Sequence, residues 1–358
     1  MIKAPNKVLW IVVIVVILIV AVSLLVRNKS NDSKVGDGVF TIGAALPMSG
    51  PAAAWGENLK NGMELALENK TNIRVIYEDT KGTPADGISA FNALQLKGVN
   101  LTVSALSAVN SALSKVALNQ KVPLLATLTT ADGIVNDYTI RYYNDAYIYA
   151  SPAFLSSSSP VISAKKIAFI YRNDDLGTSV LSQVKDLSLK YGKDLVFVEA
   201  FKPAETDYST ILTKVKASGA DVFLFTDSTA LEGLGILKMA YQLGLSIPIV
   251  ETSSVFSDLQ NRKQVPEGMT YYSTAFNFIL PGNAVDFKNE YIAKFKKEPS
   301  FGAAFGYDII NVVSGCVDQK IPILQCVRAK DQIVGISGTA NQVLPGDFVV
   351  TMHLEKVN

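Results

Sequence analysis

The sequence contains one histidine and two cysteines in 358 residues, and its charges almost cancel, with 33 Lys and Arg against 32 Asp and Glu. The single imidazole, His353, cannot supply a histidine-rich metal site, and a Ser-His-Asp or Cys-His hydrolase would need it as its base. A net charge of +1 offers no basic surplus for phosphates, which argues against nucleic-acid binding. Phosphate-loop and nucleophile-elbow motifs are absent. We therefore expect no metal, no cofactor and no nucleic-acid partner.

One long apolar run is present, from Val8 to Val26, with no charge and with Ser23 as its only polar residue. A helix of this length can cross a bilayer. No small-x-small cleavage pattern and no lipid-accepting cysteine follow it, which favours an uncleaved membrane anchor over a cleaved signal peptide. We predict a tail at 1–7, a transmembrane anchor at 8–26 and a linker at 27–38. The remaining roughly 320 residues exceed what one core usually serves, so two lobes are expected.

The two cysteines, Cys316 and Cys326, are separated by nine residues that include Pro322. A loop of this length can close a disulfide of acceptable geometry, and two unrelated buried thiols are the alternative. A disulfide would place the large domain in an oxidising compartment. Because positive charges flank the apolar run on both sides, they do not decide its orientation. The predicted location, a single-pass cell-membrane protein with its large domain on the extracytoplasmic side, therefore depends on these cysteines.

From Val39 onward, short β-rich runs alternate with amphipathic helical stretches, a pattern typical of parallel sheets covered by crossover helices. A first series fills 39–127 and a second series fills 165–252. The predicted fold class is α/β, with two doubly wound lobes. The aromatic stretches 139–145 and 269–276 can pass from lobe to lobe, which predicts a hinge with several crossings. The expected division is 39–145 plus 275–347 for lobe one and 146–274 plus 348–358 for lobe two.

Ligand sites in such folds lie where the carboxyl ends of strands meet the N-termini of helices, because backbone N–H groups there can hold an anionic or polar group. The loops that follow the strands are therefore the candidates. They are 47–56, 107–110 and 128–132 in lobe one, and 173–178 (which includes Leu176), 227–229 and 251–254 in lobe two. Hydroxyl groups and one tryptophan dominate this set.

Several segments, in order, are similar to those of one known family. They are IGAALPMSGPAAAWGENLKNGMELALE, YEDTKGTPADGISAFNAL, KIAFIYRNDDLGTS, TDYSTILTKVKASGADVFLF, and, near the end, EPSFGAAFGYDIINVV with GISGTANQVLPGDFVV. From about Phe40 onward the chain resembles the type I periplasmic binding proteins, and within them the leucine/isoleucine/valine-binding-like substrate-binding proteins of ABC transporters. The resemblance implies a non-enzymatic protein with a small-molecule ligand and an ABC permease as partners.

The resemblance also assigns binding residues in lobe one. Trp55 falls on the aromatic position that packs on the ligand side chain, and Leu128 falls where a backbone group contacts the ligand. Ser107 and Thr130 fall on the hydroxyl positions that hold a ligand carboxylate. The alternatives are that Trp55 covers the rim and that the two hydroxyls cap helices.

Lobe two departs from the amino-acid-binding pattern of the family. The carboxylate that pairs with a ligand ammonium aligns with Ser253, and its supporting aromatic residue aligns with Ser228. A buried ammonium needs an acceptor. Glu251 lies two residues before Ser253, on the same strand face, and Asp227 precedes Ser228, so either acid could substitute; the alternative is that both are ordinary loop acids.

The predicted function is an extracytoplasmic solute-binding protein that closes on a small polar ligand, such as an amino acid or an amide, and delivers it to an ABC importer. A ligand-sensing extracellular domain of a signalling system is the first alternative. An enzyme that uses cleft acids is the second, and no base-nucleophile set supports it.

Overall fold

The computed structural model describes most of the chain after the linker. The described residues are 38–143, 146–257, 259–276, 283–350 and 352–357. The predicted anchor at 8–26 lies outside them. Among the helices that are described, none is both long and apolar enough to cross a membrane. All elements below belong to one compact unit, Val35–Asn358.

An eight-stranded sheet forms the centre of lobe one, in the order β11-β12-β13-β5-β4-β3-β1-β2. The strands from β13 to β2 are parallel, and β11 and β12 add an antiparallel edge. Strand β1 is buried along its whole length, as expected for an inner parallel strand covered on both faces. The strands are β1 (Phe40–Leu46), β2 (Ile73–Asp79), β3 (Leu101–Ala105), β4 (Leu124–Thr127), β5 (Thr139–Tyr143), β11 (Gln332–Gly335), β12 (Gly338–Leu344) and β13 (Asp347–Val350).

A six-stranded sheet forms the centre of lobe two, in the order β14-β10-β9-β8-β6-β7. Only β14 at its edge is antiparallel to its neighbour. The other edge strand, β7, alternates exposed and half-buried residues over most of its length. The strands are β6 (Lys166–Arg172), β7 (Asp194–Phe201), β8 (Val222–Thr226), β9 (Ile249–Glu251), β10 (Tyr271–Phe276) and β14 (Met352–Val357).

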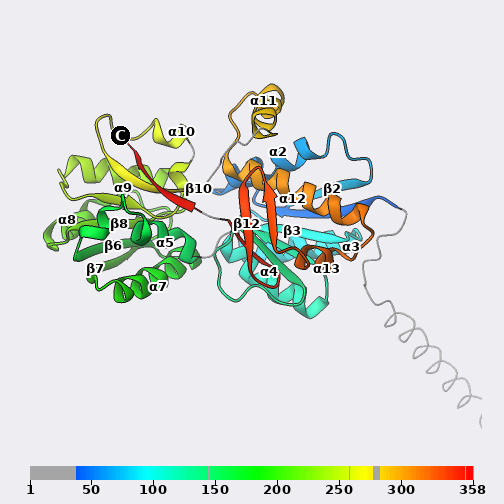
Figure 1. Cartoon of the computed structure of the whole chain (residues 1–358), viewed down its shortest axis with the longest axis horizontal. Coiled ribbons are helices and arrows are strands. Elements are labelled where there is room, and N and C mark those ends of the chain that lie inside the picture. The colour runs from blue at the N-terminus through cyan, green and yellow to red at the C-terminus, as the bar shows by residue number, and fades with distance from the viewer. Residues whose placement is uncertain (1–37, 144–145, 258, 277–282, 351, 358) are drawn as a thin grey trace, which may run out of the picture. The chain divides into compact units, whose positions relative to one another are not determined.

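Helices accompany both sheets, and Figure 1 shows the orange helices from late in the chain beside the blue and cyan elements from its start. Lobe one has α2 (Ala53–Ala66), α3 (Pro84–Leu96), α4 (Ser107–Gln120), α11 (Asn283–Phe295), α12 (Phe301–Asp318) and α13 (Ile323–Arg328). Lobe two has α5 (Ala146–Leu155), α6 (Pro160–Ser163), α7 (Asp175–Lys190), α8 (Ser209–Ala217), α9 (Ala230–Gln242), a 3₁₀ turn η1 (Val255–Ser257) and α10 (Leu259–Arg262).

The predicted pair of doubly wound α/β lobes is confirmed, and the order of the described elements takes the chain from one sheet to the other after β5, after β10 and after β13. Two of the expected lobe boundaries fall inside strands. Strand β10 runs to Phe276 in the second sheet, past 274, and β13 runs to Val350 in the first, past 347. In β13, Asp347, Phe348 and Val349 pair with β5, and Val350 pairs with Ala340 of β12.

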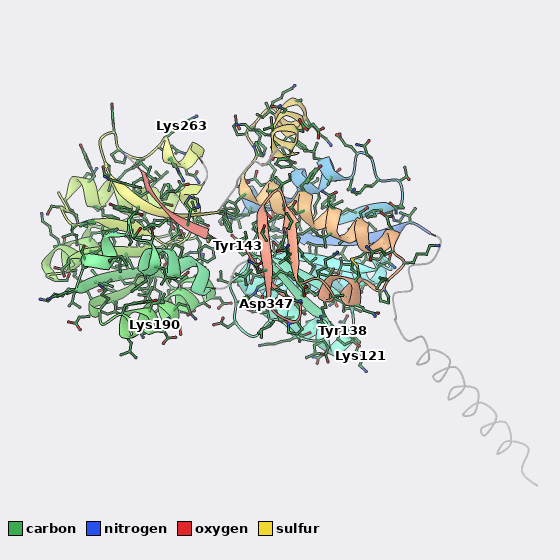
Figure 2. The ribbon with its side chains drawn as sticks, in the orientation of Figure 1. Lys121, Tyr138, Tyr143, Lys190, Lys263 and Asp347 are labelled. Atoms are coloured by element: carbon green, nitrogen blue, oxygen red, sulfur yellow. A yellow bond between two sulfur atoms is a disulfide. The ribbon has the colours of Figure 1, made fainter. Side chains whose placement is uncertain are left out.

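A buried ion pair joins β5 to β13. Arg141 donates from Nε to Asp347 Oδ1 at 2.7 Å and from Nη2 to Oδ2 at 2.6 Å, and the two residues are 5% and 4% exposed. Arg141 Nη1 also donates to the carbonyl oxygen of Ala131 at 3.2 Å. Asp347 is labelled among the elements of lobe one in Figure 2. The ion pair therefore joins β13, near the end of the chain, to β5, which lies much earlier in the sequence.

A disulfide links α12 to α13. The sulfur atoms of Cys316 and Cys326 are 2.08 Å apart, and their Cα atoms are 5.7 Å apart. Both residues are buried in a hydrophobic cluster. The disulfide thus fastens the short helix α13 to the long helix α12.

Two glycines allow helices α2 and α12 to pack unusually closely. A Cβ atom on Gly62 would lie 1.9 Å from the carbonyl oxygen of Ala303, and one on Gly306 would lie 2.1 Å from that of Leu59. Only glycine avoids these clashes. The close packing holds the second and third turns of α2 against the first two turns of α12.

Candidate ligand-binding cleft

A cavity of about 330 Å³ is lined by residues of both lobes. This volume lies within the range of small-molecule sites. Seven of the nine residues predicted for ligand binding line it. They are Trp55, Ser107, Leu128 and Thr130 from lobe one, and Leu176, Ser228 and Ser253 from lobe two. The other two, Asp227 and Glu251, do not reach the cavity, because both are fully buried behind Ser253.

Several helices begin at the cavity. The residues that precede α2, α3, α4, α7 and α9 all line it. Thr83, Asp174 and Thr229 cap their own helices α3, α7 and α9 with side-chain oxygens. Ala52 and Leu106, which precede α2 and α4, provide no such cap. In the first turn of α2, the N–H groups of Ala53 and Trp55 already donate to the carbonyl oxygens of Gly50 and Ala52. The N-terminus of α4 therefore offers N–H groups and partial positive charge to a ligand anion.

The predicted hydroxyl pair lies at the start of α4. Ser107 Oγ accepts from the backbone N–H of Thr130 at 3.1 Å, and it lies 3.5 Å from Thr130 Oγ1. A hydroxyl that accepts one hydrogen bond can still donate its own proton, and Ser107 can donate to Thr130 Oγ1 or to a ligand. Neither hydroxyl caps α4, so the helix-capping alternative is not what the structure shows. Donors gathered in this way suit a carboxylate.

Aromatic rings form much of the apolar wall. Trp55 lies 5.2 Å from Phe301 between ring centroids, and both line the cavity. Tyr143 and Tyr149 line it as well, and the hydroxyl of Tyr149 donates to that of Tyr143 at 2.6 Å. Figure 2 labels Tyr143 where the chain leaves β5. The wall offers contact to the apolar body of a ligand.

The backbone is strained around the cavity. Eight non-glycine residues in the described part of the chain have positive φ, and four of these line it. The four are Lys81 (φ 48°), Leu106 (φ 77°), Leu128 (φ 47°) and Ser254 (φ 66°). Such conformations cost about 1–3 kcal/mol each and persist where the surroundings enforce them, typically at functional sites. Each of the four lies in a loop that follows a strand of the two sheets.

The basic residue of lobe two at the cavity is already paired. Arg172 contacts Asp174 and donates from Nε to Glu232 Oε1 at 3.0 Å. Ser228 Oγ lies 3.5 Å from Asp174 Oδ2. Burial raises the pKa of Asp174, although Gly177 N–H and the Arg172 guanidinium oppose the shift. Across the described residues, no three His, Cys, Asp or Glu side chains gather as a metal site requires.

Asp227 and Glu251, the two acids that were predicted to contact the ligand, lie beneath Ser253. The hydroxyl of Ser253 contacts both Asp227 Oδ1 and Glu251 Oε1. Burial raises the pKa of Asp227 well above its ordinary value, and the neighbouring Glu251 carboxylate adds to the shift. Burial also raises the pKa of Glu251, against the opposing effect of its hydrogen bonds from Ser253 and Ser273. These acids act on the cavity through Ser253 and make no direct contact with it.

The comparison with known families decides the classification. A model described as periplasmic binding protein matches residues 39–319. The chain belongs to the periplasmic binding protein family. The resemblance to the leucine/isoleucine/valine-binding type is thereby confirmed, and curated relatives agree with it.

Two of these relatives show the extent of the match. The Leu/Ile/Val-binding protein homolog 3 of Brucella melitensis biotype 1 is 28% identical over 211 residues, covering 54% of this chain and 56% of the relative. The Leu/Ile/Val-binding protein BraC3 of Rhizobium johnstonii is 26% identical over 200 residues, covering 52% of this chain and 54% of the relative. The alignments thus span a little over half the length of these relatives.

Solved structures share the fold of this periplasmic binding protein. LivJ of Streptococcus pneumoniae, a branched-chain amino acid transporter substrate-binding protein in complex with isoleucine, matches with a TM-score of 0.77 and 22% identity, covering 89% of this chain and 96% of its own. A solute-binding protein of an ABC transporter from Rhodopseudomonas palustris BisB5, in complex with 3,4-dihydroxybenzoic acid, matches with a TM-score of 0.78 and 18% identity. The match covers 89% of this chain and 93% of that protein. At these identities the likeness concerns the fold.

Proposed function

We propose that this protein closes on a small carboxylate with an apolar body and delivers it to an ABC importer, whose permease is its membrane partner. The observation that carries the proposal is the uncapped start of α4 with the Ser107 and Thr130 hydroxyls, in a cavity walled by aromatic rings. Binding and release by movement of two lobes is a recognised mechanism for such folds. It requires no catalytic group, and the proposed role is non-enzymatic.

The ligands of the structural neighbours support this class of compound. Isoleucine in the streptococcal protein and 3,4-dihydroxybenzoic acid in the Rhodopseudomonas protein share a carboxylate beside an apolar body. N–H groups at a helix N-terminus and hydroxyl donors can hold the carboxylate. Trp55 and Phe301 can pack on the apolar body.

A thermal-shift screen of the purified protein tests the proposal. The panel contains branched-chain and aromatic amino acids, benzoate and hydroxybenzoates, with sugars and polyamines as controls. We expect the unfolding temperature to rise with at least one carboxylate in the panel. A rise with sugars or polyamines alone would contradict the proposal. Permease and ATPase genes beside this gene would favour import over sensing.

Replacing Trp55 with Ala should weaken ligand binding by about 1–3 kcal/mol, or roughly 5- to 150-fold, because a buried aromatic contact is lost. Thr130→Val should also weaken binding, since it removes a hydroxyl donor from the carboxylate site. Titration calorimetry with a ligand from the screen measures both. Tyr241→Ala, at an exposed aromatic residue of α9, is the control and should leave affinity unchanged. Unchanged affinity in both cleft variants would show that the cavity is not the binding site.

We further propose that residues 8–26 remain in the mature protein as a single-pass anchor, with the large domain on the extracytoplasmic side. The charge-free apolar run and the disulfide support this location. The protein should appear in the membrane fraction of cells, with the domain accessible to added protease. Mass spectrometry that finds a mature N-terminus after Val26 would show instead that the segment is a cleaved signal.

A further inference from the structure

Four exposed apolar side chains gather at one end of lobe two. They are Leu155 (53% exposed), Ile162 (48%), Leu189 (84%) and Tyr191 (38%), and we call them the end patch. They come from the last residue of α5, from α6, and from the last turn and the C-cap of α7. A single exposed leucine is ordinary, whereas a group of apolar side chains with a polar rim marks an interaction surface.

Contacts within lobe two hold these segments together. Phe154, which precedes Leu155, stacks on Tyr191 with ring centroids 6.4 Å apart. Lys193, which follows α7, donates from Nζ to the carbonyl oxygen of Ile162 at 2.8 Å. Helices α5 and α7 also pack against each other. The end patch is therefore one surface built from three segments.

The end patch lies far from the ligand cavity. Helix α7 begins at the cavity, which Asp175 lines, and it runs for sixteen residues. At a rise of 1.5 Å per residue, Leu189 lies roughly 20 Å farther along the helix axis. Figure 2 labels Lys190 at the lower margin of lobe two, well apart from Tyr143 of the cavity. An importer that takes the ligand from the cleft contacts the domain around the mouth of the cleft, so the end patch is left for another partner.

Positive charge surrounds the end patch. The lysines at this end of lobe two are Lys165, Lys166, Lys185, Lys190 and Lys193, and the acids are Asp186, Asp194 and Asp221. Five lysines against three aspartates leave an excess of two positive charges. The Nζ of Lys190 lies 5.3 Å from the centre of the Tyr191 ring, so this ammonium stands at the edge of the apolar surface. Long lysine stems can lie along apolar surface while the charged end contacts an anion.

We propose that the end patch binds the surface of an anionic lipid bilayer, with Leu189 and Tyr191 entering the headgroup region and the lysines contacting lipid phosphates. Apolar side chains with a lysine rim are the combination that binds such surfaces. The inference rests on the proposed anchor, because the linker at 27–38 spans at most roughly 40 Å and keeps the domain near the bilayer. At the resulting high effective concentration, a weak contact is enough to orient the domain.

A fluorescent label at the end patch tests the contact. The variant Leu189→Cys is labelled with the polarity-sensitive dye NBD in the full chain, where the native cysteines are joined and do not react. The protein is placed in lipid nanodiscs of phosphatidylglycerol or of phosphatidylcholine. We expect the emission to move to shorter wavelength and to rise about twofold or more in phosphatidylglycerol, with a smaller change in phosphatidylcholine.

The same label at Leu231→Cys is the position control, since Leu231 is 74% exposed at the start of α9 in the same lobe. Its emission should be the same in both lipids. A label at residue 189 that behaves like the label at residue 231 in both lipids would overturn the proposal. An equal shift at residue 189 in the two lipids would overturn the part of the lysines.

Charge reversal assigns the contact to the lysine rim. Lys165→Glu combined with Lys190→Glu, in the labelled Leu189→Cys chain, should reduce the emission change to less than about a third, because each charge near an anionic surface counts about fivefold. Lys238→Glu combined with Lys263→Glu makes the same charge change at exposed residues elsewhere in lobe two and should leave the signal unaltered. Figure 2 labels Lys263 at the opposite margin of the lobe from Lys190. Ligand affinity in detergent should be unchanged in both pairs.

The nanodisc experiment also separates this inference from the proposed anchor. Failure of the full chain to migrate with the discs would overturn the anchor, and the inference with it. Migration with the discs without an emission change at residue 189 would overturn the inference alone. A change that appears only when the discs also contain the permease would show that the end patch binds protein, and would overturn lipid binding.

Discussion

Replacing Asp347 with Ala should lower the free energy of unfolding by about 3–5 kcal/mol, since it leaves the Arg141 guanidinium buried without its counter-charge. The two hydrogen bonds of 2.7 and 2.6 Å that the carboxylate accepts are both lost. The remaining bond from Arg141 to the carbonyl oxygen of Ala131 does not compensate a full charge. Urea-induced unfolding followed by circular dichroism measures the change.

An exposed ion pair provides the contrast. Lys214 and Glu199 are 2.8 Å apart with side chains 50% and 36% exposed, and Glu199→Ala should change stability by less than about 1 kcal/mol. Replacing both buried partners, Arg141 with Met and Asp347 with Leu, should recover much of the loss, because no charge is then left unpaired. A change of less than about 1 kcal/mol in Asp347→Ala would mean that water reaches Arg141 in solution.

Removing the disulfide should cost about 2–4 kcal/mol. The bond restricts a short loop in the unfolded chain, for which the entropy model predicts about 3 kcal/mol. Replacing Cys316 and Cys326 together with Ala avoids a free thiol in the oxidised protein. The reduced protein should unfold at nearly the same denaturant concentration as the double variant, and the double variant should not respond to reductant.

The state of the cysteines in cells is a separate measurement. Thiol labelling of denatured, unreduced protein from its native compartment should detect no free thiol. Detection of two free thiols would show that the bond does not form there, and it would remove the support that the disulfide gives to an extracytoplasmic location.

Much of the fold was predictable from periodicity. The runs IRVIYED (β2) and DLVFVEAF (β7) lie in the two series of alternating β-rich and helical segments, and each is rich in the β-branched and aromatic residues that strands favour. Helix α2 begins at Ala53, inside the segment 47–56 that was predicted as a loop. Its start carries no sequence signal, because Ala52 precedes the helix without a capping side chain.

The lobe-one part of the candidate site was predictable because it occupies loops that follow parallel strands. The rest depends on backbone geometry that the residue types conceal. Leu106 and Leu128 adopt positive φ, which normally indicates glycine or asparagine. Glu251 and Ser253 share a strand face in the sequence pattern, yet β9 ends at Glu251 and only the serine reaches the cavity. Tyr143 was part of the aromatic stretch 139–145 that was expected to pass between the lobes, and no role was predicted for Tyr149.

The pairing of β13 with β5 has a consequence for the order of folding. Arg141 and Asp347 are 206 positions apart, so a chain emerging from the ribosome completes β1 to β5 long before their partner strand exists. The parallel strands β6 to β10 of lobe two are contiguous in sequence and can assemble in the meantime. Closing so long a loop is slow. Both sheets therefore wait for the last strands of the chain, β13 for the first sheet and β14 for the second, and until β13 has paired Arg141 lacks the carboxylate that balances its charge in the folded protein.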